Sequence, residues 1–189
     1  MLIRRRTMLR ALATLPPATL LLAACGGSMS GMNHSSGAGS GDYDRDFIDG
    51  MVPHHQAAID MAKVAQRKAE HAELKALADA IVADQDGEIA QMKGWRKAWY
   101  GTDEIAPGMG GHQMAGMDTD LAKLEAAVPF DKAFIDAMIP HHQSAIDMAK
   151  EAQTQAKRQE VKELAGRIVA AQQKEIDQMR SWRAQWYPN

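Results

Sequence analysis

Two adjacent histidines occur twice in this 189-residue chain, each time behind a proline and among methionines. Neutral imidazole binds zinc, copper, iron or nickel, whereas thioether sulfur is soft and selects Cu(I), or the similar Ag(I), over hard cations. A site that mixes these donors without cysteine therefore best matches Cu(I). The candidate ligands are His54, His55, Met51, Met61 and Met92, and, 87 residues later, His141, His142, Met138, Met148 and Met179.

The spacing of these residues predicts that they face inward from a helix. At about 100° per residue, a single stripe about 120° wide contains the two histidines, the two methionines and Phe47 of the first copy. Asp49, Gln56 and Asp60 fall on the opposite side. On the next helix Gln85, Glu88 and Met92 share the face of Ile81 and Trp95, and the second copy repeats this with Gln172, Glu175 and Met179.

A buried imidazole needs two polar partners or a metal ion. Glu88 and Glu175 are therefore either ligands or acceptors that orient an imidazole N–H, and Gln85 and Gln172 are further polar neighbours. Methionine at helical spacing is also common core filler. A metal-free cluster, in which glutamate and glutamine alone satisfy the histidines, is the alternative to a metal site.

The elements that position these residues come from an internal duplication. Positions 47–100 and 134–187 align without a gap, and roughly 60 % of the pairs are identical, which indicates a repeated supersecondary unit. One helix hairpin cannot bury its apolar stripe alone, so two related hairpins predict an all-α, ferritin-like four-helix bundle with pseudo-twofold symmetry. The predicted helices cover 44–67, 73–99, 131–155 and 160–187, with a short one over 119–127. Pro53 should kink or break the first helix.

The predicted domain covers 42–187, as repeat one (42–100), a linker (101–118) and repeat two (119–187). The linker is rich in glycine and carries candidate peripheral metal contacts at Met109, His112, Met114 and Met117. His71 has no histidine counterpart, because Arg158 stands in its place, and we expect it at the surface. The tryptophan pairs that close each repeat should be core or end-plugging aromatics.

Residues 1–25 resemble a bacterial lipoprotein signal. A basic start precedes an apolar run that is too short to span a bilayer and ends in Leu22-Ala23-Ala24-Cys25-Gly26, so Cys25 is the predicted acylation site and membrane anchor. The basic start also resembles a twin-arginine export signal. Residues 26–41 are rich in glycine and serine and predict a flexible tether. The expected location is the periplasm or the cell surface.

Composition excludes several classes of function. One cysteine cannot form an intrachain disulfide, a thiolate zinc cage or an iron–sulfur cluster. The net charge of −2 becomes more acidic when the leader's arginines are removed, which argues against nucleic-acid binding.

The motif Phe-Ile-x-x-Met-[Val/Ile]-Pro-His-His-Gln-x-Ala-Ile-x-Met-Ala, followed by Gln-x-x-Glu-Ile-x-Gln-Met-x-x-Trp, occurs in both halves. It resembles the family called domain of unknown function 305, over nearly all of residues 42–187. The resemblance implies a ferritin-like bundle and export, and likeness to a copper-binding periplasmic member implies copper binding and copper tolerance. The family's signature falls on the histidines and methionines already named.

Three functions compete. The first is a lipid-anchored protein, not an enzyme, that binds Cu(I) or Ag(I) and buffers it or exchanges it with a copper donor or acceptor protein. The second is a di-metal oxidoreductase, but that class uses Glu-x-x-His motifs that neither repeat contains. The third is a metal-free surface interaction module. The sequence leaves the oligomeric state open.

Overall fold

A computed structural model describes residues 41–105 and 119–188 of the chain. The predictions for the leader, Cys25, most of the tether, and Met109, His112, Met114 and Met117 lie outside these residues. All secondary structure in the described part is helical. Its helices are α1 (Tyr43–Lys68), α2 (Ala72–Tyr100), α3 (Leu121–Glu125), α4 (Phe130–Gln155) and α5 (Gln159–Trp186). The predicted helices are confirmed, with ends that differ by at most two residues, which is the usual uncertainty of helix termini.

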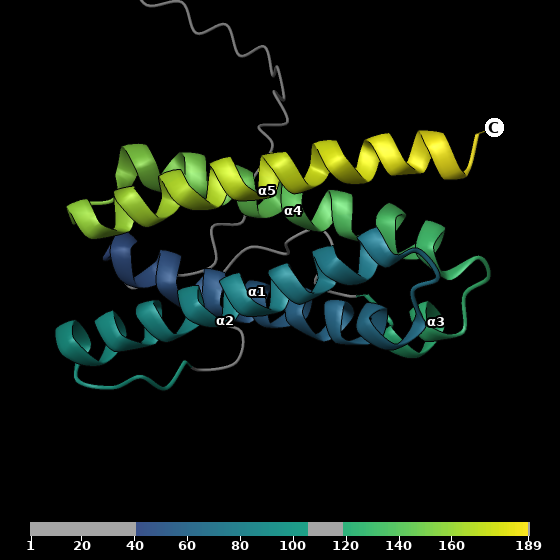
Figure 1. The fold of residues 1–189 in the computed structure, drawn as a ribbon. Helices are drawn as coiled ribbons and strands as arrows, with labels where there is room; N and C mark the ends of the chain where they lie inside the picture. Colours follow the sequence, from purple (N-terminus) through teal and green to yellow (C-terminus); the bar gives the residue numbers. More distant parts are fainter. Residues whose placement is uncertain (1–40, 106–118, 189) are drawn as a thin grey trace, which may run out of the picture. The chain divides into compact units, whose positions relative to one another are not determined.

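The helices pack as two hairpins (Figure 1). Helix α1 packs along α2, α4 packs along α5, and contacts between α1 and α4 join the hairpins, while the short α3 rests on α1 and α4. This is the predicted four-helix bundle of two repeated hairpins. None of the described helices combines the length and the apolar character needed to cross a membrane.

Neither proline breaks its helix. Pro53 lies inside α1 and Pro140 inside α4, and both helices run on through them, so of the kink or break predicted at Pro53 the break does not occur. A proline removes one intrahelical hydrogen bond, at a cost of about 3 kcal/mol in an isolated helix. Here both helices bury apolar residues on either side of the proline, and this packing holds each helix together.

Two aspartates fix how the hairpins meet. The carboxylate of Asp44, at the start of α1, accepts hydrogen bonds from the backbone N–H groups of Lys157 (2.9 Å) and Arg158 (3.1 Å), where α5 begins. Its repeat Asp131 accepts from the N–H groups of Glu70 and His71, where α2 begins. Neither α2 nor α5 has a side-chain cap of its own. Each hairpin therefore caps a helix of the other, and the carboxylates suit the positive ends of the helix dipoles.

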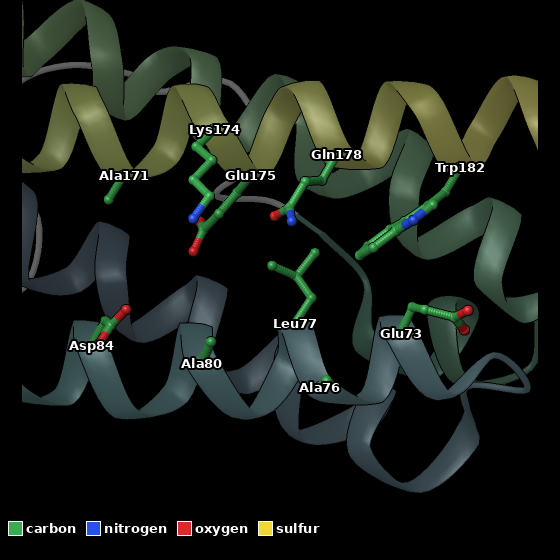
Figure 2. Close-up of a pocket in the computed structure, with 10 residues that line it drawn as sticks. All are labelled: Glu73, Ala76, Leu77, Ala80, Asp84, Ala171, Lys174, Glu175, Gln178 and Trp182. Atoms are coloured by element: carbon green, nitrogen blue, oxygen red, sulfur yellow. The ribbon is translucent and has the colours of Figure 1, made fainter.

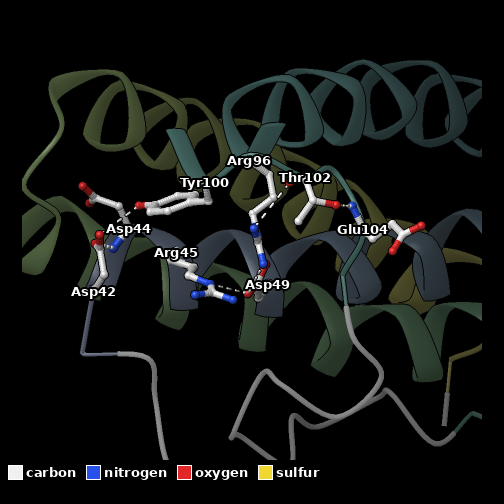
Figure 3. Close-up of polar contacts among 8 residues, drawn as sticks. All are labelled: Asp42, Asp44, Arg45, Asp49, Arg96, Tyr100, Thr102 and Glu104. Atoms are coloured by element: carbon white, nitrogen blue, oxygen red, sulfur yellow. Dashed lines mark hydrogen bonds and ion pairs between the residues drawn. The ribbon is translucent and has the colours of Figure 1, made fainter. Parts of the chain in front are cut away.

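Asp49 corrects the sequence analysis. It was expected on the solvent side of α1, yet it is buried and pairs with buried Arg96, with 2.7 Å between Oδ1 and Nε (Figure 3). Arg96 also donates to the carbonyl oxygen of Thr102, and Arg45 approaches the same aspartate at 3.5 Å. A buried charge is costly unless it is paired, so the partner on α2 decides where Asp49 can lie.

His71 is also less peripheral than predicted. Its ring stacks on Trp186 with 3.7 Å between centroids, and its Nδ1 lies 2.7 Å from the buried carboxylate of Asp131. The counterpart Arg158 lies over Trp99 in the same way, at 4.0 Å. The tryptophans therefore pack at the ends of the hairpins, as predicted, and a cationic or aromatic side chain covers each outer ring.

Candidate metal centre

The two repeats meet at a pair of equivalent histidines. His54 on α1 and His141 on α4 have ring centroids 3.9 Å apart, and His142 follows at 6.3 Å from His141. These three histidines and His55 are at most 1 % exposed. The inward stripe expected on each first helix is thus confirmed for its imidazoles, and the helix contact brings the two pairs together.

A carboxylate holds one ring of each pair. Nε2 of His55 lies 2.7 Å from Oε2 of Glu88, and Nε2 of His142 lies 2.7 Å from Oε2 of Glu175. An ionised carboxylate only accepts hydrogen bonds, so Nε2 carries the proton in both rings. In a neutral ring this leaves Nδ1 as the atom with the lone pair, and both Nδ1 atoms are buried without a protein partner.

Ser144 fixes a third ring. Its Oγ lies 2.7 Å from Nε2 of His54 and donates to the carbonyl oxygen of His141 at 2.8 Å. Since a serine has one hydroxyl proton, Oγ must accept from His54, which again leaves Nδ1 with the lone pair. The counterpart of Ser144 in the first repeat is Ala57. Accordingly neither ring nitrogen of His141 has a hydrogen-bond partner.

The cluster is rich in buried polar atoms that no protein group satisfies. Five of them are imidazole nitrogens, namely Nδ1 of His54, His55, His141 and His142 and Nε2 of His141. The side-chain oxygens of Gln85 and Gln172 are also unpartnered. A buried polar atom without a partner costs about 1–3 kcal/mol, and most such atoms in proteins are paired. The unpaired nitrogens of His54 and His141, whose rings are in contact, are therefore candidate metal ligands.

Burial keeps the two central rings neutral. Loss of solvation, followed by the neighbouring His141, His55 and His142, lowers the pKa of His54 to about 2. Burial, with His142 and His55, likewise lowers the pKa of His141 to about 3. The backbone of His54 opposes this lowering in part, although it makes no hydrogen bond of normal geometry to the ring. Neutral imidazole is the form that binds a metal ion, so both rings stay competent as ligands well below neutral pH.

The predicted methionines divide between the two apolar clusters of the core. Met51, Met92 and Met148 belong to one apolar cluster, and Met138, Met179 and Met61 belong to the other. Each group takes two methionines from one repeat and the third from the other. All are buried except Met148, which is partly exposed, so its predicted inward position is confirmed only in part.

The donor set distinguishes between metals. Within residues 41–105 and 119–188, no three side chains of histidine, cysteine, aspartate or glutamate are arranged to hold a metal ion. A metal site here would therefore need donors of another type beside one or two imidazoles, and the buried methionines supply thioether sulfur. This combination suits a soft monovalent ion of low coordination number better than the nitrogen, oxygen and thiolate cages of zinc or iron.

Sequence reasoning missed Ser144, because it is one of the positions at which the repeats differ. The difference was itself a signal: Ala57 and Ser144 interrupt an otherwise repeated Pro-His-His-Gln-x-Ala-Ile-Asp-Met-Ala motif. Position 144 is three residues beyond His141, so a hydroxyl there lies over the same helical turn.

The chain belongs to the family described as "Domain of unknown function (DUF305)", whose model matches residues 44–183. Among solved structures it is similar to CopM in its Cu(I)-bound form, with 43 % sequence identity, a TM-score of 0.68, and coverage of 76 % of this chain and 97 % of that one. CopM has also been solved in Cu(II)-bound, silver-bound and apo forms.

A solved structure of lower sequence identity shares the fold, and one curated protein matches part of the sequence. A DUF305 protein from Streptomyces coelicolor is 27 % identical, with a TM-score of 0.70 and coverage of 76 % of this chain and 93 % of that one. The uncharacterized protein L153 of Acanthamoeba polyphaga mimivirus is 43 % identical over 51 residues, which are 27 % of this chain and 34 % of that protein. The match to this curated relative thus spans about a third of its length.

Proposed function

We propose that this protein binds Cu(I), and Ag(I) as its chemical analogue, at the histidine cluster between α1 and α4. The observation that carries the proposal is the set of five buried imidazole nitrogens without partners, in a core that also buries five of the six candidate methionines. The likeness to a protein solved with Cu(I), Cu(II) and silver supports it from an independent direction.

The hydrogen bonds suggest a role for each residue. His54, His55 and His142 would bind through Nδ1, because their Nε2 protons are engaged, and His141 could use either nitrogen. Thioether sulfur from the neighbouring methionines would complete the coordination and exclude hard cations. Glu88 and Glu175 would orient imidazoles rather than bind metal, since each already accepts from a ring N–H.

We further propose a storage or transfer role and not catalysis. A ferritin-like di-metal site needs carboxylates that bridge two ions. Each glutamate here is paired with the histidine of its own hairpin at 2.7 Å, which favours a role as an orienting acceptor. An exchangeable soft ion would instead suit a protein that buffers copper and passes it to or from another protein.

Anaerobic competition titration with a coloured Cu(I) chelator tests the binding. The full chain should take up Cu(I), and the variant His54→Ala/His55→Ala/His141→Ala/His142→Ala should lose that uptake. His71→Ala is the matched control, because this histidine lies at the end of the bundle, in contact with Trp186.

The thermal midpoint gives a second measurement. Metal that binds only the folded state should raise it, by the equivalent of about 2.7 kcal/mol at a hundred times the dissociation constant. A midpoint unchanged by Cu(I) and Ag(I), together with zero stoichiometry, would leave the metal-free interaction module as the better assignment.

We also propose that the protein acts outside the cytoplasm as a lipoprotein anchored through Cys25. The support is the sequence pattern of residues 1–25, in which the sole cysteine follows small residues at the end of an apolar run. Labelling cells with a fatty-acid analogue should tag the wild type and not Cys25→Ser. A protein that remains in the cytosol in both cases would contradict this location.

A further inference from the structure

One ion pair occurs in both repeats, but its surroundings differ. Arg96 pairs with Asp49 in the first repeat, with 2.7 Å between Nε and Oδ1. Arg183 pairs with Asp136 at the equivalent positions of the second repeat, at 2.8 Å. The side chains of the first pair are 4 % and 3 % exposed, whereas those of the second are 24 % and 44 % exposed. The same contact is therefore closed to solvent in one repeat and open in the other.

The chain that follows α2 turns back to the first pair. Gly101 ends α2 in the left-handed region, with φ +83°. The carbonyl oxygen of Thr102 then accepts a hydrogen bond from Nη1 of Arg96 at 3.4 Å (Figure 3). Two exposed acidic residues follow, and Ile105 packs against the apolar core. Residues 101–105 thus bring a carbonyl oxygen, two carboxylates and an aliphatic side chain to this side of the first repeat.

The second repeat cannot close its own pair in this way. Pro188 stands where the first repeat has Gly101, and its ring fixes φ at about −65°, so the chain cannot make the same left-handed turn. A hollow of about 440 Å³ lies beside the second pair, lined by Asp136, Arg180, Arg183, Ala184, Tyr187 and Pro188. The hollow therefore corresponds to the place that residues 101–105 take in the first repeat.

The hollow is positively charged. Its lining carries two guanidinium groups and one carboxylate. Arg183 donates from Nε to Asp136 and from Nη1 to the carbonyl oxygen of Tyr187, which leaves Nη2 without a partner in the described part of the chain. Arg180 is 57 % exposed, and the carboxylate of Asp177 lies 3.9 Å from it. Guanidinium groups bind carboxylates through charge-assisted hydrogen bonds, so this surface suits an acidic ligand.

A second groove carries the opposite charge. It has a volume of about 570 Å³ and lies between α2 and α5 (Figure 2). Three carboxylates and one ammonium group line it, on Glu73, Asp84, Glu175 and Lys174. An acidic ligand is repelled from this groove and attracted to the arginines of the hollow. The groove therefore serves as an internal control for binding at the hollow.

We propose that the hollow beside Arg183 is a docking site for an extended acidic segment of a partner protein. The segment places neighbouring carboxylates on Arg180 and Arg183 and an aliphatic side chain beyond them, in the order that residues 103–105 have in the first repeat. A partner is favoured over exchange of residues 101–105 between two copies, because in each copy this segment already contacts its own first repeat. The inference does not depend on metal binding.

A peptide that copies residues 101–105, acetyl-Gly-Thr-Asp-Glu-Ile-amide, is the probe. Titrated into the ¹⁵N-labelled full chain, it should shift the amide signals of Arg180, Arg183 and Ala184 and leave that of Ala80 in the acidic groove unchanged. Affinity should be about tenfold lower for Arg180→Ala, and for a peptide with asparagine and glutamine in place of its two acids, because each loses charge-assisted hydrogen bonds. Lys150→Ala, an exposed position on α4 outside the hollow, should bind like the wild type.

A tethered segment tests whether the hollow is the site. The variant Pro188→Gly/Asn189→Thr, extended by the tripeptide Asp-Glu-Ile, restores the sequence of the first repeat after Tyr187. The tether gives its acids a high effective concentration at the hollow, so the free peptide should bind about tenfold more weakly or worse. A peptide that shifts no signal at the hollow, or that binds equally well without its acids, would overturn the docking site. Hollow signals that move with protein concentration alone, together with a dimer in sedimentation, would assign the surface to a second copy and overturn the partner.

Discussion

The hydroxyl of Ser144 on α4 accepts a hydrogen bond from Nε2 of His54 on α1, and the equivalent position in the first repeat is Ala57, which can accept none. This one difference makes the central pair of histidines unequal. His54 is held in a single tautomer, while His141 has two unpartnered nitrogens. The ring whose two nitrogens both lack a hydrogen-bond partner therefore belongs to the second repeat.

Exchanging the serine should exchange this property. Ser144→Ala removes the acceptor of a buried N–H and should lower the free energy of unfolding by about 1–3 kcal/mol. Ala57→Ser should supply the missing acceptor to His141 and raise it by about 1 kcal/mol. Ring ¹⁵N chemical shifts of the metal-free protein report the tautomers directly. The wild type should show protonated Nε2 at His54, and Ala57→Ser should show it at His141 as well. Identical spectra for all three proteins would contradict the assigned network.

Replacing methionine by leucine separates packing from ligation. Met92→Leu/Met179→Leu keeps the buried volume, so the free energy of unfolding should change by less than about 1.5 kcal/mol. Cu(I) affinity should fall by about tenfold or more, since the soft sulfur donors are what favour this ion. Unchanged Cu(I) affinity would show that these methionines only fill the core.

If the glutamates orient the imidazoles, replacing them should weaken Cu(I) binding without abolishing it. Glu88→Gln and Glu175→Gln each keep an acceptor for the imidazole N–H but remove its charge, so Cu(I) affinity should drop about 10–100-fold with unchanged stoichiometry. X-ray absorption of the loaded protein should show nitrogen and sulfur neighbours in both variants and in the wild type. Oxygen in the wild-type first shell, lost on substitution, would make the glutamates ligands instead.

The parts of this structure that the sequence predicts are those set by local periodicity. The burial of Met51, His54 and Met92 follows from helical spacing, because the inward face of a helix is fixed by 3.6 residues per turn. The bundle follows from the duplication, since each hairpin needs a second apolar face. The continuity of α1 through Pro53 could not be read this way, because the packing that offsets the lost hydrogen bond comes from other helices.

Spacing rules could not predict polar contacts between different helices. Asp44 reaches the first residues of α5, and Asp49 pairs with Arg96 on α2, each over a long sequence separation. The clue available was recurrence, because Asp44 returns as Asp131 and Arg96 as Arg183 at the same offset. A polar residue kept in both copies of a duplicated unit indicates a partner, but only the three-dimensional arrangement says which one.

Neutral central histidines predict that the metal-free protein loses stability in mild acid. His54 and His141 have pKa values lowered from 6.5 to about 2 and about 3 in the folded state. Below pH 6.5 the unfolded chain therefore binds protons at these residues and the folded chain does not. The free energy of unfolding therefore keeps its full value above pH 6.5 and decreases as the pH falls toward the pKa values of the folded state. Between pH 7.5 and 5.5 the two residues should together remove about 2–3 kcal/mol from the free energy of unfolding.

Urea unfolding at the two pH values measures this loss. The double variant His54→Leu/His141→Leu replaces both rings with apolar side chains and should reduce the difference between the two pH values by the same 2–3 kcal/mol, or about half of it for either single variant. Every other titrating group is common to wild type and variants, so the comparison isolates the central pair. Equal pH dependence in wild type and double variant would mean that these rings are solvated and charged in the folded protein, against the burial on which the ligand assignment depends.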